Sequence, residues 1–305
     1  MRERRAGNRA RTDPRRKLSM AALKRVGVVG CGLMGAGIAQ VVAQAGIETF
    51  VREVDQPLLD KGLGRIRKFL DDGVAKGKVT AEDKDRVLAN IKGTTKLEDL
   101  AGCELVVEAV VESIGAKREV FSTLDKLVKP DAVLASNTSS LSITEIAATT
   151  TRPGRVLGLH FFNPVPLMKL VEIIRALPTS DQAFERARGF VEQLGKTAVV
   201  CKDTPGFVVN RLLVPYLLDA VRLLESGLAS REDIDNGMKL GCGYPMGPLT
   251  LLDFVGLDTT YYIANIMFEE FRQPHFAPPP LLKRMVLAGY MGRKSGRGFY
   301  DYAKS

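Results

Sequence analysis

VGVVGCGLMGAGIAQVVAQAG (residues 26–46) decides the fold of this 305-residue chain. Its Gly30-x-Gly32-x-x-Gly35 pattern follows a β-branched run and opens an apolar, helix-like stretch. A dinucleotide site needs glycines there, because the backbone turns sharply and approaches a pyrophosphate at a helix N-terminus with free N–H groups. The pattern alone is weak, and a glycine turn that serves only packing is the alternative. The flanking strand and helix favour a dinucleotide site.

A second strand-like run, residues 48–52, ends beside an acid. Glu53 lies 23 residues beyond Gly30, where a carboxylate can accept hydrogen bonds from an adenosine ribose. The same charge repels a 2′-phosphate. The sequence therefore favours NAD over NADP, although the neighbouring Arg52 keeps NADP open.

Short β-branched runs alternate with helix-like stretches from Arg25 to about Lys202. Strands that are apolar throughout and separated by helices are typical of parallel, doubly wound sheets. We predict an α/β fold, with a Rossmann-type, mostly parallel, NAD-binding domain over residues 24–203. The predicted strands cover residues 25–30, 48–52, 104–110, 132–136, 155–160, 169–174 and 197–201.

Two segments depart from this alternation. Residues 57–90 are polar and without a strand-like run, and Thr80-x-x-Asp83 is a capping pattern, so we predict a helical-hairpin insertion there. After Asp203 helical periodicity prevails, and we predict a smaller all-α domain over residues 204–305. Thr204 and Pro205 are predicted to be the N-cap and first residue of its first helix.

The net charge of +9 is concentrated near the N-terminus. Residues 1–17 contain eight Lys or Arg and two Asp or Glu, and the folded body is nearly neutral. The body has no basic stripe interleaved with aromatics, so we expect no nucleic-acid partner; such a role could rest only on the leader. We predict that residues 1–23 are a disordered or mis-assigned basic leader. A functional basic arm and a targeting segment are the alternatives.

The four cysteines are scattered and form no Cys-x-x-Cys pair. This usage suits reduced thiols in a cytoplasmic protein and argues against a disulfide framework or a zinc site. No apolar run reaches the roughly 20 residues that a membrane span needs. We therefore expect a cytoplasmic protein without metal or membrane partners.

GLHFFNPVPLMKLVEII (residues 158–174) holds one of only two histidines. Glu172 interrupts an apolar strand, where a lone carboxylate needs a partner. His160 lies twelve residues earlier, and a turn at Asn163-Pro164 would bring the two strands together. A carboxylate on one ring nitrogen leaves the other to take a proton from a substrate hydroxyl as hydride leaves for nicotinamide. A structural histidine is the alternative.

Two further polar spots fit this chemistry. SNTSS (residues 136–140) follows a strand at the sheet edge where ligands of such folds bind, and its hydroxyls could hold a substrate oxygen or cap the next helix. Asn210 is predicted to share an apolar helix face with Phe207 and Val214, so its amide needs a partner from the substrate or another helix. His275 has no predicted role.

Together these motifs resemble the L-3-hydroxyacyl-CoA dehydrogenase family, and most closely its single-function bacterial 3-hydroxybutyryl-CoA dehydrogenases. Their order and spacing are far more specific than the glycine loop alone. The resemblance extends from about residue 24 to residue 302 and leaves only the leader unmatched. The matching segments are VGVVGCGLMGAGIAQ, VVEAVVES, SNTSSLSITEIA, GLHFFNPVPLMKLVEII, DTPGFVVNRLL, GYPMGPLTLLDFVGLD and GRKSGRGFYDY.

The resemblance implies NAD-dependent oxidation of a short-chain L-3-hydroxyacyl-CoA to the 3-oxoacyl-CoA, and the reverse. It implies that His160 is the catalytic base and Glu172 its orienting partner, with Ser139 and Asn210 at the reacting end of the substrate. The cofactor residues that it implies are Gly30, Gly32, Leu33, Met34, Gly35, Glu53, Glu112, Lys117, Asn137 and Lys294. The substrate residues are Ser139, Asn163, Asn210 and Lys76.

Several consequences depend on this resemblance. The segment GRKSG, which alone reads as part of a flexible tail, would carry Lys294 back to the dinucleotide site. Family members commonly have Asp where this chain has Glu53, which keeps the charge on a longer side chain. The α-domain would form a homodimer, with a cleft closing between the domains.

Relatives that act on sugar acids are the same-fold alternative, but the unbroken HFFNPVPLMKLVEII favours an acyl-CoA substrate. A non-catalytic, dinucleotide-binding structural or redox-sensing protein is the other alternative.

Overall fold

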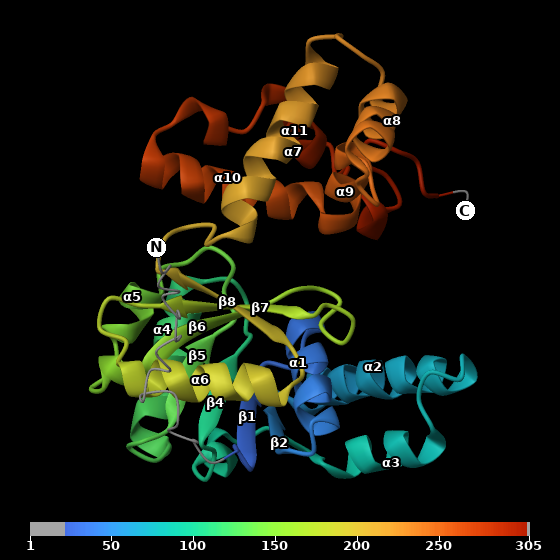
Figure 1. The fold of residues 1–305 in the computed structure, drawn as a ribbon. Coiled ribbons are helices and arrows are strands. Elements are labelled where there is room, and N and C mark those ends of the chain that lie inside the picture. The colour runs from blue at the N-terminus through green and yellow to red at the C-terminus, as the bar shows by residue number, and fades with distance from the viewer. Residues whose placement is uncertain (1–21, 304–305) are drawn as a thin grey trace, which may run out of the picture.

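The strands form one eight-stranded sheet in the computed structural model, which describes residues 22–303 (Figure 1). Its order is β3-β2-β1-β4-β5-β6-β7-β8, and every neighbouring pair is parallel except β6 and β7. The strands are β1 (Arg25–Val29), β2 (Glu48–Arg52), β3 (Ile91–Thr94), β4 (Leu105–Glu108), β5 (Val133–Ser136), β6 (Val156–Phe161), β7 (Leu170–Arg175) and β8 (Thr197–Lys202).

This topology confirms the predicted doubly wound, mostly parallel sheet, but β3 was not predicted. Its sequence, IKGT, includes Lys92 and Gly93, and both residues are exposed. β3 lies at the edge of the sheet and pairs only with β2. The strand therefore lacks the apolar run by which the buried strands were identified.

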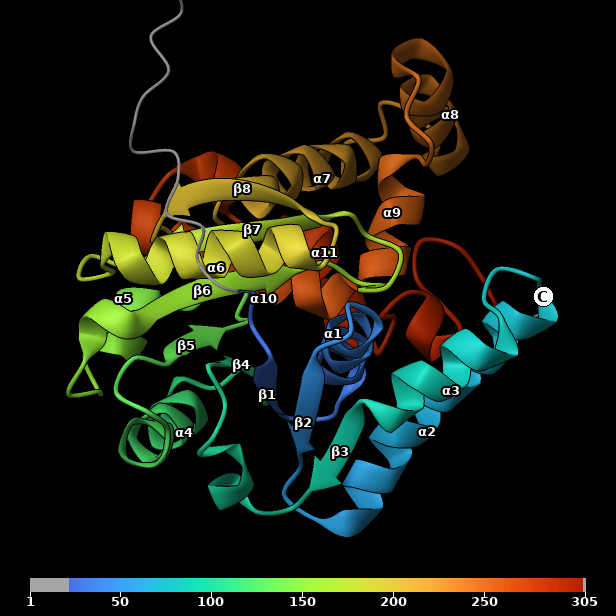
Figure 2. The same cartoon turned by 60° about the horizontal axis from the view of Figure 1, so that its bottom comes forward.

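Helices cover both faces of the sheet (Figure 2). One apolar core packs α1 (Leu33–Gln44) and α6 (Asp181–Gln193) against one face. A second core packs α4 (Ile114–Leu127) and the short α5 (Ile143–Ala147) against the other. Strands buried on both faces are apolar throughout, and for this reason their sequences identified them.

The predicted helical insertion consists of α2 (Gln56–Ala75) and α3 (Ala81–Ala89), which project from the sheet (Figure 1). Thr80 Oγ1 accepts a hydrogen bond from the Asp83 N–H at 3.0 Å. This bond satisfies one of the free N–H groups at the start of α3. The predicted cap is confirmed.

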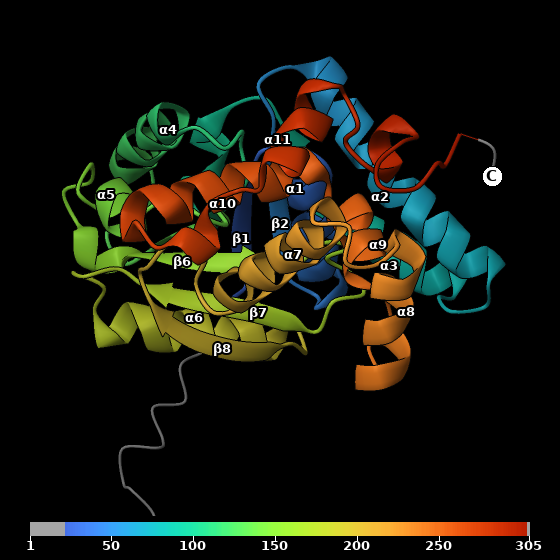
Figure 3. The ribbon, with the colours of Figure 1, turned by 90° about the horizontal axis from the view of Figure 1, so that it is seen from above.

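The remaining helices form a separate layer with its own apolar core. They are α7 (Val209–Glu225), α8 (Arg231–Cys242), α9 (Pro248–Val255), α10 (Leu257–Phe271) and α11 (Pro280–Leu287). Seen from above, α7 and α10 lie over the sheet (Figure 3). This arrangement confirms the predicted all-α region after the sheet.

The predicted start of the first helix of this layer is wrong. Thr204 and Pro205 lie in a turn, and α7 begins only at Val209. Gly206 and Phe207 have φ of +80° and +47°, in the left-handed region, which a right-handed helix cannot include. Phe207 therefore precedes the helix and does not share a helical face with Asn210.

The predicted leader, residues 1–23, lies outside the described residues except for its last two. Leu23 is buried, and its N–H donates to Gln193 Oε1 at 3.0 Å. The packed body thus includes Leu23, one residue before the predicted boundary at Lys24. Within residues 22–303 no helix has the length and apolar character to cross a membrane.

Candidate active site

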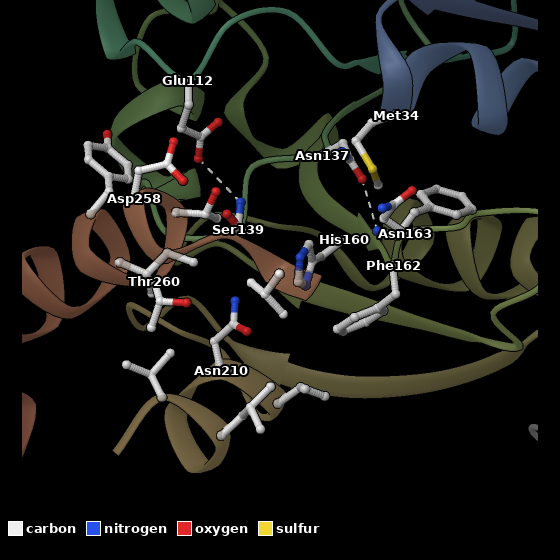
Figure 4. Close-up of a pocket in the computed structure, with 18 of the residues that line it drawn as sticks. Met34, Glu112, Asn137, Ser139, His160, Phe162, Asn163, Asn210, Asp258 and Thr260 are labelled. Atoms are coloured by element: carbon white, nitrogen blue, oxygen red, sulfur yellow. Dashed lines mark hydrogen bonds between the residues drawn. The ribbon is translucent and has the colours of Figure 1, made fainter. Parts of the chain in front are cut away.

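A cavity of about 670 Å³ lies where the carboxyl ends of β4, β5 and β6 meet α7, α9 and α10. Polar side chains from the sheet side and the helical side point into it (Figure 4). Those predicted from the sequence and found in its lining are Glu112, Lys117, Asn137, Ser139, His160, Asn163 and Asn210. The structure therefore brings together residues that are up to 98 positions apart, as for Glu112 and Asn210.

His160 and Glu172 are direct partners across the antiparallel pair β6–β7. His160 Nδ1 lies 2.7 Å from Glu172 Oε2, and their side chains are 8% and 0% exposed. An ionised carboxylate only accepts hydrogen bonds, so Nδ1 carries the hydrogen. The neutral ring therefore keeps Nε2 as an acceptor, and the ring lies against the cavity (Figure 4).

The second oxygen of Glu172 binds the start of α7. Oε1 accepts from the backbone N–H groups of Val208 at 3.0 Å and Val209 at 2.9 Å. Such N–H groups at a helix start lack intrahelical partners and favour a negative charge. One buried carboxylate thus holds both the His160 ring and the helix that carries Asn210.

Ser139 and Asn210 approach the cavity from opposite sides (Figure 4). Ser139 donates its backbone N–H to Glu112 Oε1 at 3.3 Å, and within residues 22–303 its hydroxyl makes no hydrogen bond. The helix-capping alternative for SNTSS is wrong, because Ser142 caps α5. The Ser139 hydroxyl is therefore available to a ligand.

Asn137 and Asn163 complete the polar lining near His160 (Figure 4). Asn137 Oδ1 accepts from the Phe161 N–H at 2.9 Å, which orients its amide nitrogen group away from that bond. Asn163 lies in the loop between β6 and β7. Phe162, in the same loop, places its ring centroid 4.5 Å from that of His160.

The glycine loop has the geometry that a dinucleotide requires. Gly30 has φ of +96°, and a Cβ there would lie 2.5 Å from Ala109 O. A Cβ on Gly35 would lie 1.8 Å from Gly30 O, whereas one on Gly32 would meet nothing within 4 Å. The first turn of α1 has no side-chain cap. The backbone thus packs tightly at Gly30 and Gly35, but space is left next to Gly32. Free N–H groups at this helix start fit a pyrophosphate.

Glu53 lies beside this loop. Its two oxygens accept from the N–H groups of Cys31 at 2.7 Å and Val54 at 2.8 Å. The carboxylate is held at the end of β2, where it fits a ribose. Of the two remaining loop residues, Leu33 is exposed and Met34 lines the cavity.

Lys117 is buried in an ion-pair network that the sequence did not reveal. Its Nζ lies 2.8 Å and 3.1 Å from the two oxygens of Glu108, and 3.2 Å from Glu112. Glu108 is fully buried and also accepts from Ser136 Oγ at 2.6 Å. The only sequence signal was an acid that ends the apolar strand LVVE.

Two cysteines near these groups stay protonated at neutral pH. Burial, reinforced by the charge of Glu53, raises the pKa of Cys31 to about 12. Burial, reinforced by the charge of Glu172, raises the pKa of Cys201 to about 12. Neither thiol is therefore a nucleophile beside the site.

The whole body of the chain matches one family. Residues 25–204 match its description "3-hydroxyacyl-CoA dehydrogenase, NAD binding domain", and residues 206–302 match "3-hydroxyacyl-CoA dehydrogenase, C-terminal domain". The chain belongs to the 3-hydroxyacyl-CoA dehydrogenase family.

Similar proteins agree with this membership. The 3-hydroxybutyryl-CoA dehydrogenase of Mycobacterium tuberculosis is 55% identical over 283 residues, which are 92% of this chain and 99% of the relative. The crystal structure of FadB2 from Mycobacterium tuberculosis has a TM-score of 0.91 at 55% identity, with 92% and 99% covered. That of (S)-3-hydroxybutyryl-CoA dehydrogenase PaaH1 from Ralstonia eutropha has a TM-score of 0.89 at 45% identity, with 93% and 100% covered.

The protein is thus an NAD-dependent 3-hydroxyacyl-CoA dehydrogenase, which decides against the sugar-acid and non-catalytic alternatives. The three loop glycines, Leu33, Glu53 and Glu172, described above, lie outside the cavity lining, and so do the predicted residues Lys76 and Lys294. Lys76 ends α2 in the helical insertion. Lys294 is 52% exposed, and its Nζ lies 2.6 Å from Asp258, which does line the cavity.

The apolar wall of the dehydrogenase cavity was not predicted. Leu213, Val214 and Leu217 follow Asn210 on α7 at steps of three, four and seven residues, so they share its helical face. Phe254 on α9 and other residues of α9 and α10 face them. The sequence shows the helical periodicity of these residues. It does not show which face of the helix borders the cavity.

Proposed function

We propose that this dehydrogenase interconverts 3-hydroxybutyryl-CoA and acetoacetyl-CoA, with His160 and Glu172 as its general base/acid pair. The observation that carries the proposal is the 2.7 Å contact between His160 Nδ1 and Glu172 Oε2, which leaves Nε2 as an acceptor in the cavity. Relatives named 3-hydroxybutyryl-CoA dehydrogenase support the four-carbon substrate.

In the oxidative direction, His160 Nε2 takes the proton of the substrate hydroxyl. Bound NAD⁺ supplies the acceptor for the hydride that leaves the same carbon. The ring then carries two N–H groups and a positive charge, which the Glu172 carboxylate balances while the Nδ1 bond persists. In the reductive direction the imidazolium returns the proton to the carbonyl oxygen.

Ser139 and Asn210 would hold the reacting oxygen. Both side chains line the cavity beside His160, and the Ser139 hydroxyl has no partner within the described chain (Figure 4). Hydrogen bonds to an oxygen whose charge changes during reaction favour the transition state. Asn163 would contact the substrate from the β6–β7 loop.

The cofactor would lie along the glycine loop, with its pyrophosphate beside Gly32 and its ribose at Glu53. Met34, Glu112 and Asn137 line the cavity between that loop and His160, which supports contacts with the nicotinamide half. Two backbone N–H groups hold the Glu53 carboxylate at the end of β2, where a carboxylate would repel a 2′-phosphate, and this supports NAD over NADP.

Lys117 and Lys294 would act on the cofactor side through the carboxylates they bind, Glu112 and Asp258. Lys76, the C-cap of α2, would contact the phosphates of coenzyme A. Large exposed side chains on α7 and α8, Leu212 and Leu240, support a homodimer through the helical domain. The four free cysteines support a cytoplasmic location.

Steady-state kinetics test the proposal. The rate with acetoacetyl-CoA should be compared with longer 3-oxoacyl-CoA substrates, each with NADH and NADPH, and with L-gulonate and NAD⁺. We expect the highest kcat/KM for acetoacetyl-CoA with NADH. A preference for a longer chain would overturn the four-carbon assignment, and turnover of L-gulonate alone would overturn the substrate class.

A further inference from the structure

One lysine side chain binds the middle of the loop that joins the two halves of the base/acid pair. This loop, residues 162–169, connects β6 with His160 to β7 with Glu172. Lys196 lies between α6 and β8, and its Nζ donates to Val165 O at 2.8 Å and Met168 O at 2.6 Å. Both bonds therefore end on the backbone of the loop.

Lys196 has no carboxylate to balance its charge within residues 22–303. Its side chain is half-buried, and burial lowers the pKa of the ammonium below the usual lysine value. A half-buried cation without a counter-ion is unfavourable unless strong hydrogen bonds compensate. Bonds from an ammonium to carbonyl oxygens are charge-assisted and stronger than neutral ones.

The loop accepts hydrogen bonds from outside at three carbonyls: two bind Lys196, and Lys169 O, next to β7, accepts from the Thr197 N–H at 2.7 Å. Inside the loop, Pro164 O accepts from the N–H groups of Leu167 and Met168, both at 3.0 Å, so this turn supports itself. Val165 is buried, and a Cβ on Gly37 of α1 would lie 2.9 Å from Val165 Cβ. The loop is thus pressed against the dinucleotide-binding helix on one side and tied to Lys196 on the other.

The anchored loop carries side chains that face the reacting groups. The Phe162 ring lies 4.5 Å from the His160 ring, and Asn163 lines the cavity next to it (Figure 4). A shift of the loop would move both side chains relative to the base. Misplacement of groups by about 1 Å can cost on the order of 10² in rate.

We propose that Lys196 is a positioning residue of this dehydrogenase, which fixes Phe162 and Asn163 against the His160 ring by holding the 162–169 loop. The inference rests on the proposed role of His160 as the base. Lys196 itself touches neither the cavity lining nor the pair.

The test compares Lys196→Met, Lys196→Arg and the matched control Lys202→Met, an exposed lysine at the far end of β8. Each full-length variant is assayed with acetoacetyl-CoA and NADH well below its Tm. Lys196→Met removes both donors but keeps the aliphatic stem, so we expect kcat to fall roughly 10- to 100-fold. KM for NADH should change little, because the glycine loop is not touched.

Lys196→Arg keeps a charged double donor and should restore most of the lost kcat. Hydrogen exchange of the peptide 162–169 should be faster in Lys196→Met and unchanged in Lys202→Met. A Lys196→Met enzyme with a lowered Tm but normal kcat, or with unchanged loop exchange, would overturn the inference. His160→Gln assayed in parallel separates the two proposals, since its normal turnover would sink the base assignment instead.

Discussion

Replacement of Glu172 by glutamine should disable the base while it leaves the protein folded. In the native site one oxygen accepts from the Val208 and Val209 N–H groups, and the other accepts from His160 Nδ1. The amide oxygen of glutamine can satisfy only one of these positions. Two backbone donors face the first position, so the oxygen should stay there and the NH₂ group should face Nδ1.

This orientation reverses the tautomer of the ring. Because the NH₂ group donates, Nδ1 must accept, and the hydrogen moves to Nε2. His160 then presents a donor to the cavity and cannot take the hydroxyl proton. We expect kcat to fall on the order of 10² to 10⁴, or about 3 to 5.5 kcal/mol of transition-state stabilisation.

Stability should respond differently to glutamine and alanine. Glu172→Gln keeps the bonds to the start of α7, whereas Glu172→Ala leaves two partly buried N–H groups without their acceptor. A fully buried group of this kind costs about 1–3 kcal/mol, so the two partly buried groups should cost the alanine variant up to about 6 kcal/mol of unfolding free energy. The glutamine variant should lose clearly less.

The assay is the oxidation of NADH with acetoacetyl-CoA, with urea unfolding in parallel. Glu119→Gln, an exposed glutamate on α4, is the matched control and should behave as wild type. A Glu172→Gln enzyme with near-normal kcat would refute the tautomer argument. Equal destabilisation by Gln and Ala would refute the helix-capping role.

Two further predictions concern the cofactor loop and acid stability. Gly35→Ala should greatly weaken NADH binding in a fluorescence titration, because its Cβ would lie 1.8 Å from Gly30 O; unchanged affinity would contradict the described turn. Burial opposes ionisation of Asp125, but hydrogen bonds from Thr151 and Arg152 outweigh it and hold its pKa below the usual value. The folded pKa is depressed, so its stabilisation is present above about pH 4 and is lost as the pH falls. Asp125→Asn should therefore cost stability at neutral pH, by a margin that shrinks in acid unfolding experiments, and a constant margin would contradict this.

Much of the fold could be predicted from the sequence, because its strands and caps depend on residues that are close together in the chain. The strands β1, β4, β5 and β6 are buried on both faces, so each is an apolar run that sequence alone reveals. The glycine loop and the Thr80 cap likewise depend on neighbouring residues. The edge strand β3 has no fully buried residue and includes Lys92, so it carried no such signal.

The site residues also differ in whether neighbouring sequence or tertiary packing brings them together. His160 and Glu172 are twelve residues apart and joined by one turn, so their pairing could be predicted from strand alternation and the cost of a buried charge. The Glu172 bonds to Val208 and Val209 could not, because they depend on the left-handed turn at Phe207. Asp258 reaches the cavity only through the packing of the helical layer on the sheet.

The most direct test of the account is a comparison of turnover and NADH binding in His160→Gln. Glutamine keeps a polar side chain near the cavity but cannot accept a proton as imidazole does. We predict a kcat lower on the order of 10² to 10⁴ and an NADH dissociation constant close to wild type. Normal turnover, or an NADH affinity that is lost while the saturated rate persists, would contradict the role of His160 as the base.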